Sequence, residues 1–169
     1  MPRREEKFDL NASPSEVWRF IRDFEALCKC IPGIEKIDLV DDRTADLTVK
    51  EKVGVIPMIL TLRARIESED PPRRLHATAR AEHLTMAIDV SLQPSGSATE
   101  LASCFDVTGT GQLKLIVDRL FEKRATERSA QFAECLGKRF GGTPPQEARQ
   151  ALRGGWLHRL TEWLRRCLN

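Results

Sequence analysis

Hydrophobic residues alternate with polar ones along much of the chain. This alternation occurs in five segments: 44–53, 56–67, 75–82, 84–92 and 101–107. In each of them the side chains of one register are almost wholly apolar, and those of the other register are charged or polar. A period of two is typical of strands with one dry face and one wet face. Short turns such as Asp70-Pro71-Pro72 separate the segments, so the pattern predicts an antiparallel meander. Arg4–Leu10 alternates in the same way, more weakly, and predicts a first strand.

Two segments have helical spacing instead. Ser13 as N-cap, Pro14 at the first helical position and Glu16 three residues after the cap predict a short helix, which Pro32-Gly33 would end. From Leu113 to Phe140 apolar residues recur at helical spacing without a proline. This predicts a helix of roughly 28 residues, about 42 Å long.

The order of these elements predicts an α+β fold of the helix-grip type. A curved antiparallel sheet of about seven strands would wrap round the long C-terminal helix. Because one helix cannot fill a strongly curved sheet, we expect a cavity between the two. The glycines and prolines of 141–145 mark a boundary between a ligand-binding domain, 1–142, and a linker with an appended helix, 143–169.

The last fourteen residues or so, 156–169, form an amphipathic pattern. Its apolar side carries Trp156, Leu157, Leu160, Trp163, Leu164 and Leu168. Basic residues border that side at Arg159, Arg165 and Arg166. This composition suits a helix lying on an anionic membrane, with tryptophan at the level of the headgroups. The same apolar side could instead dock into a groove of a partner or onto its own domain, and these alternatives stay open.

Several short motifs resemble one protein family. Ser15-Glu16-Val17-Trp18, then Asp23, then Cys30-Ile31-Pro32-Gly33 resemble the N-terminal signature of the CoxG family of carbon monoxide dehydrogenase subunits. Asp106–Leu113 is similar to the family's junction between last strand and long helix, and Gln131-Phe132 resembles its late-helix aromatic. The family belongs to the START-like, polyketide-cyclase-related (SRPBCC) superfamily, whose fold agrees with the one predicted above. The resemblance covers residues 8–140.

The resemblance implies an accessory role. Members are encoded with molybdenum-containing hydroxylases of the carbon monoxide dehydrogenase type and are linked to membrane recruitment and to the quinone pool. It therefore implies a non-catalytic protein that holds a hydrophobic ligand, such as a quinone or lipid, without a covalent cofactor. Its partner would be the molybdenum hydroxylase complex. The chain departs from the family pattern at the turn 40–43 and at the helix start 114–116.

The predicted lining of the cavity is the apolar register of the strands together with one face of the long helix. It comprises Leu47, Val49, Met58, Leu60, Ala77, Ala79, Met86, Ile88, Ser103, Phe105, Ile116, Leu120, Ser129, Phe132 and Ala133. Small side chains in this set would leave volume unfilled, and its methionines would adapt to a ligand. The alternative is that all of them simply pack as core.

Glu51 lies in the apolar register of its strand. Burial of a lone carboxylate is costly, so it would either pair with another group or reach the rim of the cavity, where it would be a polar handle for a ligand. The alternative is a solvated side chain near the end of a frayed strand.

Composition restricts the remaining function classes. Formal net charge is only +2, which gives no electrostatic case for nucleic acid. Five cysteines, an odd number in a chain of this length, argue against a disulfide framework, and Cys30 is expected to be a packed residue before the Pro-Gly turn. A polar N-terminus and the absence of a long apolar run predict a cytoplasmic protein, peripheral on the inner face of the membrane.

Catalytic and metal motifs are missing from the sequence. No histidine has ligand spacing to Cys28 or Cys30, so we expect no metal site. There is no nucleophile elbow, phosphate loop or dinucleotide fingerprint, and the chain contains no tyrosine. A small enzyme of the cyclase or dehydratase type and a ligand-free structural adaptor remain as alternatives to the binding protein.

Overall fold

The computed structural model describes residues 2–53 and 55–141. Within them the strands are β1 (Arg3–Leu10), β2 (Ile34–Leu39), β3 (Thr44–Val53), β4 (Ile56–Asp70), β5 (Arg74–Ala81), β6 (Leu84–Ser95) and β7 (Ala98–Gly109). The helices are α1 (Pro14–Arg22), α2 (Phe24–Lys29) and α3 (Gly111–Phe140). The predicted combination of an antiparallel sheet and a long C-terminal helix is confirmed.

All seven described strands form one antiparallel sheet in the order β1-β7-β6-β5-β4-β3-β2. Strands β2 to β7 are a meander, and β1 joins its free edge beside β7. The alternation in the sequence did not locate β2. A register shift between Ile34 and Lys36 interrupts the period of two in this short strand, so the pattern is hidden there.

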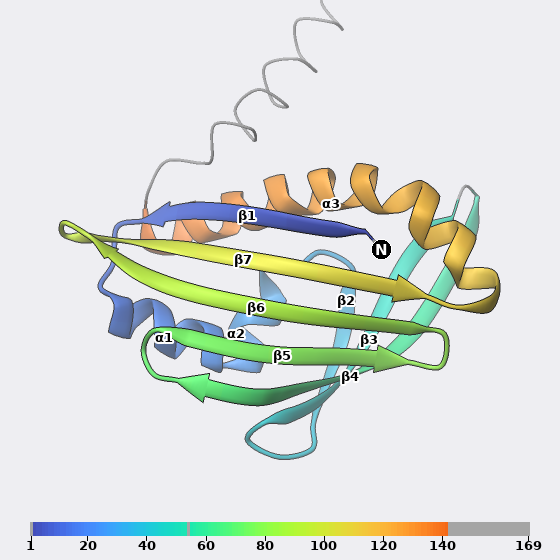
Figure 1. The fold of residues 1–169 in the computed structure, drawn as a ribbon, viewed down its shortest axis with the longest axis horizontal. Helices are drawn as coiled ribbons and strands as arrows, with labels where there is room; N and C mark the ends of the chain where they lie inside the picture. The colour runs from blue at the N-terminus through green and yellow to red at the C-terminus, as the bar shows by residue number, and fades with distance from the viewer. Residues whose placement is uncertain (1, 54, 142–169) are drawn as a thin grey trace, which may run out of the picture.

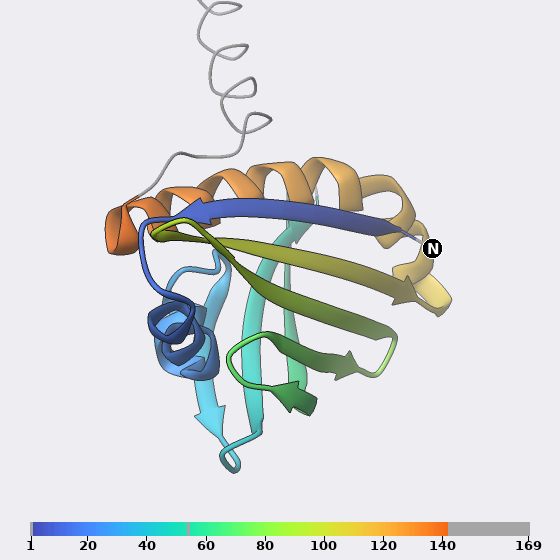
Figure 2. The same cartoon turned by 60° about the vertical axis from the view of Figure 1, so that its left-hand side comes forward.

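The sheet curves strongly around its inner face. Strands β1 and β7 run alongside α3, whereas β2, β3 and the first part of β4 run steeply across its direction (Figure 1, Figure 2). Helix α3 has 30 residues and is therefore about 45 Å long. It contacts β7 and β1 most extensively, while α1 and α2 cover the part of the inner face next to β6 and β2.

The motif that begins α1 acts through its hydrogen bonds. The Glu16 amide donates to the Ser13 hydroxyl (3.3 Å) and the Ser13 amide donates to the Glu16 carboxylate (2.9 Å), which completes the predicted capping box. Asp23 then caps α2 by accepting from the Ala26 amide (3.0 Å). Much of the N-terminal signature thus sets where α1 and α2 begin and end.

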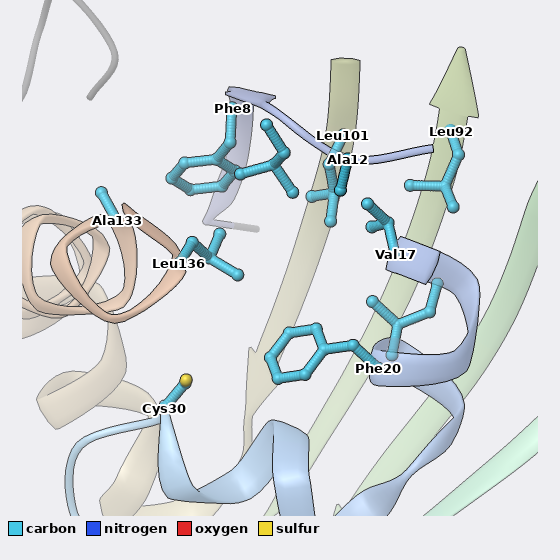
Figure 3. Packing of buried hydrophobic residues seen from close by; sticks show 11 residues of the cluster. Phe8, Ala12, Val17, Phe20, Cys30, Leu92, Leu101, Ala133 and Leu136 are labelled. Atoms are coloured by element: carbon cyan, nitrogen blue, oxygen red, sulfur yellow. The ribbon is translucent and has the colours of Figure 1, made fainter. Parts of the chain in front are cut away.

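The buried core consists of two separate clusters. The first lies between α1, the C-terminal part of α3 and strands β1, β6 and β7 (Figure 3), and contains Phe8, Leu10, Ala12, Val17, Phe20, Ile21, Cys30, Leu92, Leu101, Ala133 and Leu136. The second joins α2 to β3, β4 and β5, and contains Cys28, Ala45, Leu47, Val49, Leu62, Ala64 and Ala79. A domain usually has one contiguous core, so the division of the buried residues into two clusters is a distinctive feature of this domain.

Cys30 and Cys135 form a disulfide, with their Cα atoms 5.5 Å apart. The expectation that Cys30 is only a packed residue was therefore wrong. The two cysteines are 105 positions apart in sequence, and only the packing of α3 over the end of α2 brings them together. Sequence spacing cannot reveal such a pairing.

We expect the disulfide to make a large contribution to stability, because it closes a loop of about a hundred residues in the unfolded chain. Replacing both cysteines by serine should lower the free energy of unfolding by about 4 kcal/mol. Urea denaturation of the oxidised wild type and of the double variant measures this difference. Dithiothreitol should destabilise the wild type and leave the variant unchanged; equal stability of the oxidised wild type and the double variant would contradict the pairing.

Candidate functional site

A row of apolar side chains crosses the inner face of the sheet between the two core clusters. Ala77 of β5 pairs with Ile88 of β6, and Ile88 pairs with Phe105 of β7. All three are only partly buried, and none belongs to either cluster. We call Ala77, Ile88 and Phe105 the inner row. Residues on the inner face of a filled sheet would be buried, so the sheet is incompletely covered along this row.

The other predicted lining residues divide into two groups. Leu47, Val49, Ala79 and Ala133 belong to the core clusters, Phe132 and Met86 pack against them, and Ser103 is buried outside both. The residues that share the partial exposure of the inner row are Met58, Leu60, Ile116, Leu120 and Ser129.

The two halves of α3 differ in how they meet the sheet. In the C-terminal half Ala133 and Leu136 are buried, and the ring of Phe132 packs edge-to-face on Phe8 with centroids 5.5 Å apart. In the N-terminal half no described residue is buried, and Leu115 is exposed. The apolar attachment of the helix is therefore concentrated at its end, and the uncovered part of the inner face lies toward its beginning.

Glu51 of β3 ties the sheet to the middle of α3. Its carboxylate pairs with Arg128 and lies 3.4 Å from Nε of Arg124. Arg124 also donates to the carbonyl of Lys52 (2.9 Å). The Glu51 side chain is 22 % exposed, so of the alternatives for this residue the paired one is observed.

Gly33 allows this tie to form. It has φ of 91°, and a Cβ atom there would lie 3.1 Å both from the Lys50 carbonyl oxygen and from Arg128. A side chain at this position would push against the β3 backbone and against the arginine that holds Glu51. The predicted Pro-Gly stop after α2 therefore also gives the arginine its space.

A second polar tie was missed by the sequence analysis. Arg4 pairs with Glu6 on the inner side of β1 (2.6 Å) and donates to the Thr126 hydroxyl of α3 (3.2 Å). Arg4 is also the cross-strand partner of Phe105, so the tie lies at the end of the inner row. The available signal was the period of two in β1, which puts Arg4 and Glu6 in the same register as Phe8.

Two hollows are described, and neither is lined by the inner row. One, of about 580 Å³, crosses five strands and is lined mostly by outward-facing residues such as Lys7, Asp70 and Asp89. The other lies between α1 and the end of α3, with Arg19 and Arg139 in its lining. The evidence that the inner face is incompletely covered is therefore the partial exposure of its side chains and not an enclosed cavity.

The remaining candidate groups lie away from the inner row. His76 faces outward and its Nδ1 is 2.7 Å from Asp89. Cys28 is in the second core cluster, where burial raises the pKa of its thiol to about 11, so it is a weak nucleophile at neutral pH. In the ranges 2–53 and 55–141 no three potential ligands converge on a metal position.

The predicted tail contacts fall outside the described residues. This applies to Trp156, Leu157, Leu160, Trp163, Leu164, Leu168, Arg159, Arg165 and Arg166. Among the helices of the described part, none has the length and apolar character needed to span a bilayer.

A comparison with protein families decides the family of this chain. The model of the carbon monoxide dehydrogenase subunit CoxG matches residues 7–141. The chain belongs to the CoxG family. The match ends where the described structure ends, at Gly141, and includes the inner row and the Glu51 tie, whereas Arg4 and Glu6 precede its first residue. No curated protein matches the chain in sequence.

Solved structures with the same fold support the architecture of this CoxG-family chain. A conserved protein from Geobacillus kaustophilus has a TM-score of 0.69 and 17 % identity, over 82 % of this chain and 94 % of that one. A START superfamily protein from Mycobacterium smegmatis has a TM-score of 0.64 and 16 % identity, over 82 % and 96 %. A protein from Chromobacterium violaceum has a TM-score of 0.63 and 18 % identity, over 85 % and 100 %. The fold is START-like.

We expect the Glu51 tie to stabilise the fold. Glu51→Gln keeps the size of the side chain and removes the charge that Arg124 and Arg128 share, which leaves Glu127 as the partner of Arg124 (3.0 Å). The free energy of unfolding should fall by about 1.5 kcal/mol, measured by urea denaturation. Glu35→Gln is the matched control, because the Glu35–Lys50 pair is largely exposed (3.4 Å) and should contribute less than about 0.5 kcal/mol. Equal losses in the two variants would contradict a special role of Glu51.

Proposed function

We propose that this chain is a non-catalytic binding protein that holds an apolar molecule of the quinone or lipid class between α3 and the inner face of its sheet. We further propose that it acts as an accessory protein for a molybdenum hydroxylase of the carbon monoxide dehydrogenase type. Its C-terminal segment, 143–169, would contact the inner face of the membrane.

The observation that carries the proposal is the partial exposure of the inner row. Ala77, Ile88 and Phe105 face the same side as the buried core, yet they lie in neither cluster. Apolar surface left in contact with water costs about 25 cal/mol per Å². An apolar ligand would remove that contact, and Met58 and Leu60 would extend the same surface along β4.

The polar groups near the inner row favour binding over catalysis. Glu51 is engaged with Arg124 and Arg128, and Glu6 is engaged with Arg4. A general acid or base must be placed to exchange a proton with a substrate. Glu51 instead holds α3 to the sheet, and Glu6 holds Arg4, which contacts Thr126 of α3.

The family name supports the partner. A model described as a subunit of carbon monoxide dehydrogenase matches most of the chain, so that enzyme class is the partner we propose. The amphipathic pattern of 156–169 supports the membrane contact, because two tryptophans and flanking arginines suit an anionic interface.

The proposal is tested by mass spectrometry of a solvent extract of the purified full-length chain, beside an extract of an unrelated soluble protein from the same cells. A stoichiometric quinone or lipid found only with this chain is the expected result. An empty extract, repeated after incubation with decylubiquinone, would overturn the binding function and favour the enzyme or the adaptor.

The position of the ligand is tested by adding bulk to the inner row. Ala77→Trp should weaken decylubiquinone binding at least tenfold, because the indole would occupy the surface beside Ile88. Ala87→Trp is the matched control, since Ala87 is the neighbour of Ile88 on β6 and faces outward. Isothermal titration calorimetry on folded variants measures both. Unchanged binding in Ala77→Trp would show that the ligand lies elsewhere.

A further inference from the structure

The end of the β3–β4 hairpin exposes aliphatic side chains. Val55 is 97 % exposed, Ile56 66 % and Ile59 63 %. We call Val55, Ile56 and Ile59 the hairpin tip. Together they are half of the large hydrophobic residues that are exposed in the described part of the chain. Ile56 is on the inward side of β4 and Ile59 on the outward side, so this end of the hairpin exposes apolar side chains on both faces. Exposed apolar side chains gathered in this way are typical of an interaction site.

The hairpin tip is held in place against α3. Its two strands are paired up to Val53 and Ile56. Arg124 of α3 donates to the Lys52 carbonyl, and Glu51 pairs with Arg124 and Arg128. The exposure of the aliphatic side chains is therefore a property of an anchored hairpin.

The charges around the hairpin tip are basic. From Lys52 to Leu62 the chain has one basic residue, Lys52, and no acidic one, and Lys50 at the same end of β3 pairs with the exposed Glu35 (3.4 Å). Lys50 and Lys52 lie in the outward register, where they pair across the strands with Ile59 and Pro57. An exposed apolar cluster beside lysines suits the surface of an anionic membrane, where the lysines meet phosphates and the aliphatic groups enter the apolar layer.

The opposite end of β3 provides an internal contrast. The β2–β3 hairpin also exposes aliphatic residues, Leu39 and Val40, but acidic residues surround them at Asp38, Asp41 and Asp42. Negative charge at that position would repel anionic lipid. In the β2–β3 hairpin these three aspartates outnumber the basic residues Lys36 and Arg43, whereas Lys50 and Lys52 lie beside the β3–β4 hairpin tip. The balance of charge therefore favours the β3–β4 hairpin as the contact with an anionic membrane.

A second copy of the chain is a poorer occupant. A symmetric contact between two hairpin tips would place Lys50 and Lys52 of one copy against the same residues of the other. Like charges brought together in this way oppose association. An anionic lipid surface satisfies both the aliphatic and the basic groups.

The inward side of β4 leads from the hairpin tip toward the inner row. Ile56, Met58 and Leu60 follow one another on that side, and the exposure decreases along them from Ile56, which is exposed, to Met58 and Leu60, which are partly buried. A molecule leaving the bilayer at the hairpin tip would therefore meet apolar side chains on its way to the inner face.

We propose that the β3–β4 hairpin tip inserts into the surface of an anionic membrane and is the place where a lipid-soluble ligand enters or leaves the domain. This rests on the proposed function, since it says where the ligand crosses between bilayer and protein. It differs from the proposed contact of the C-terminal segment, because it assigns a second contact to the START-like domain itself.

The test places an environment-sensitive probe at the hairpin tip of the full-length chain. Val55→Cys is labelled with a nitrobenzoxadiazole fluorophore in a chain that also carries Cys104→Ser and Cys167→Ser. Cys28 is buried with a raised thiol pKa, and Cys30 and Cys135 are bonded to each other, so the new thiol takes the label. Val40→Cys, labelled in the same way, is the matched control on the other hairpin.

With vesicles of three parts phosphatidylcholine and one part phosphatidylglycerol, the probe at position 55 should shift to the blue and brighten at least twofold. The probe at position 40 should not change, and pure phosphatidylcholine vesicles should give a smaller response at position 55. In a flotation assay with the same mixed vesicles, Val55→Asp should reduce the bound fraction at least fivefold, and Val40→Asp should leave it unchanged.

The failures can be told apart. If the chain floats with the vesicles but the probe at position 55 does not respond, the contact is made elsewhere and the hairpin proposal is wrong, while membrane recruitment stands. If the chain does not float, both membrane contacts are wrong. In either case the solvent extract decides separately whether the domain holds a ligand.

Discussion

The structure depends on one mismatch, between a single long helix and the inner face of a curved seven-stranded sheet. Helix α3 is about 45 Å long, but a helix with its side chains is only about 10 Å wide, so it can bury only part of such a face. The short helices α1 and α2 cover another part. Two separate core clusters result, one between α1 and the C-terminal part of α3 and the other under α2, and the inner row belongs to neither. The open inner face therefore follows from the geometry of the fold.

This mismatch explains how α3 is attached. Where the helix meets α1, β1 and β7, it is held by buried residues, by the edge-to-face contact of Phe132 with Phe8, and by the disulfide. Along the middle of the helix, where the sheet curves away, the attachments are ion pairs and hydrogen bonds from Arg4 and Glu51. Long arginine side chains can span a gap that short apolar ones cannot close. The helix stays fixed while the apolar face beside it remains uncovered.

The same geometry links the inner face to the surface of the molecule. Glu51 and Lys52 anchor the end of the β3–β4 hairpin on α3, so the exposed residues of the hairpin tip have a fixed position relative to the inner row. Ile56, Met58 and Leu60 occupy successive inward positions of one strand and so connect the two surfaces. The proposed binding surface and the proposed route to it thus share one hairpin and one helix.

The sequence by itself determined the fold class, most strands, the long helix and the capping box of α1, because each of these depends on local periodicity or on hydrogen bonds between residues close in the chain. It also placed Ala77, Ile88 and Phe105 on the inner face, since alternation distinguishes one face of a strand from the other. Only the tertiary structure decided which inner residues are core, such as Leu47 and Ala133, and which remain partly exposed. Alternation carries no information on what packs against a face. The Cys30–Cys135 bond, the Arg4–Thr126 hydrogen bond and the Glu51 tie all join residues far apart in sequence that only the packing of α3 against the rest of the domain brings together.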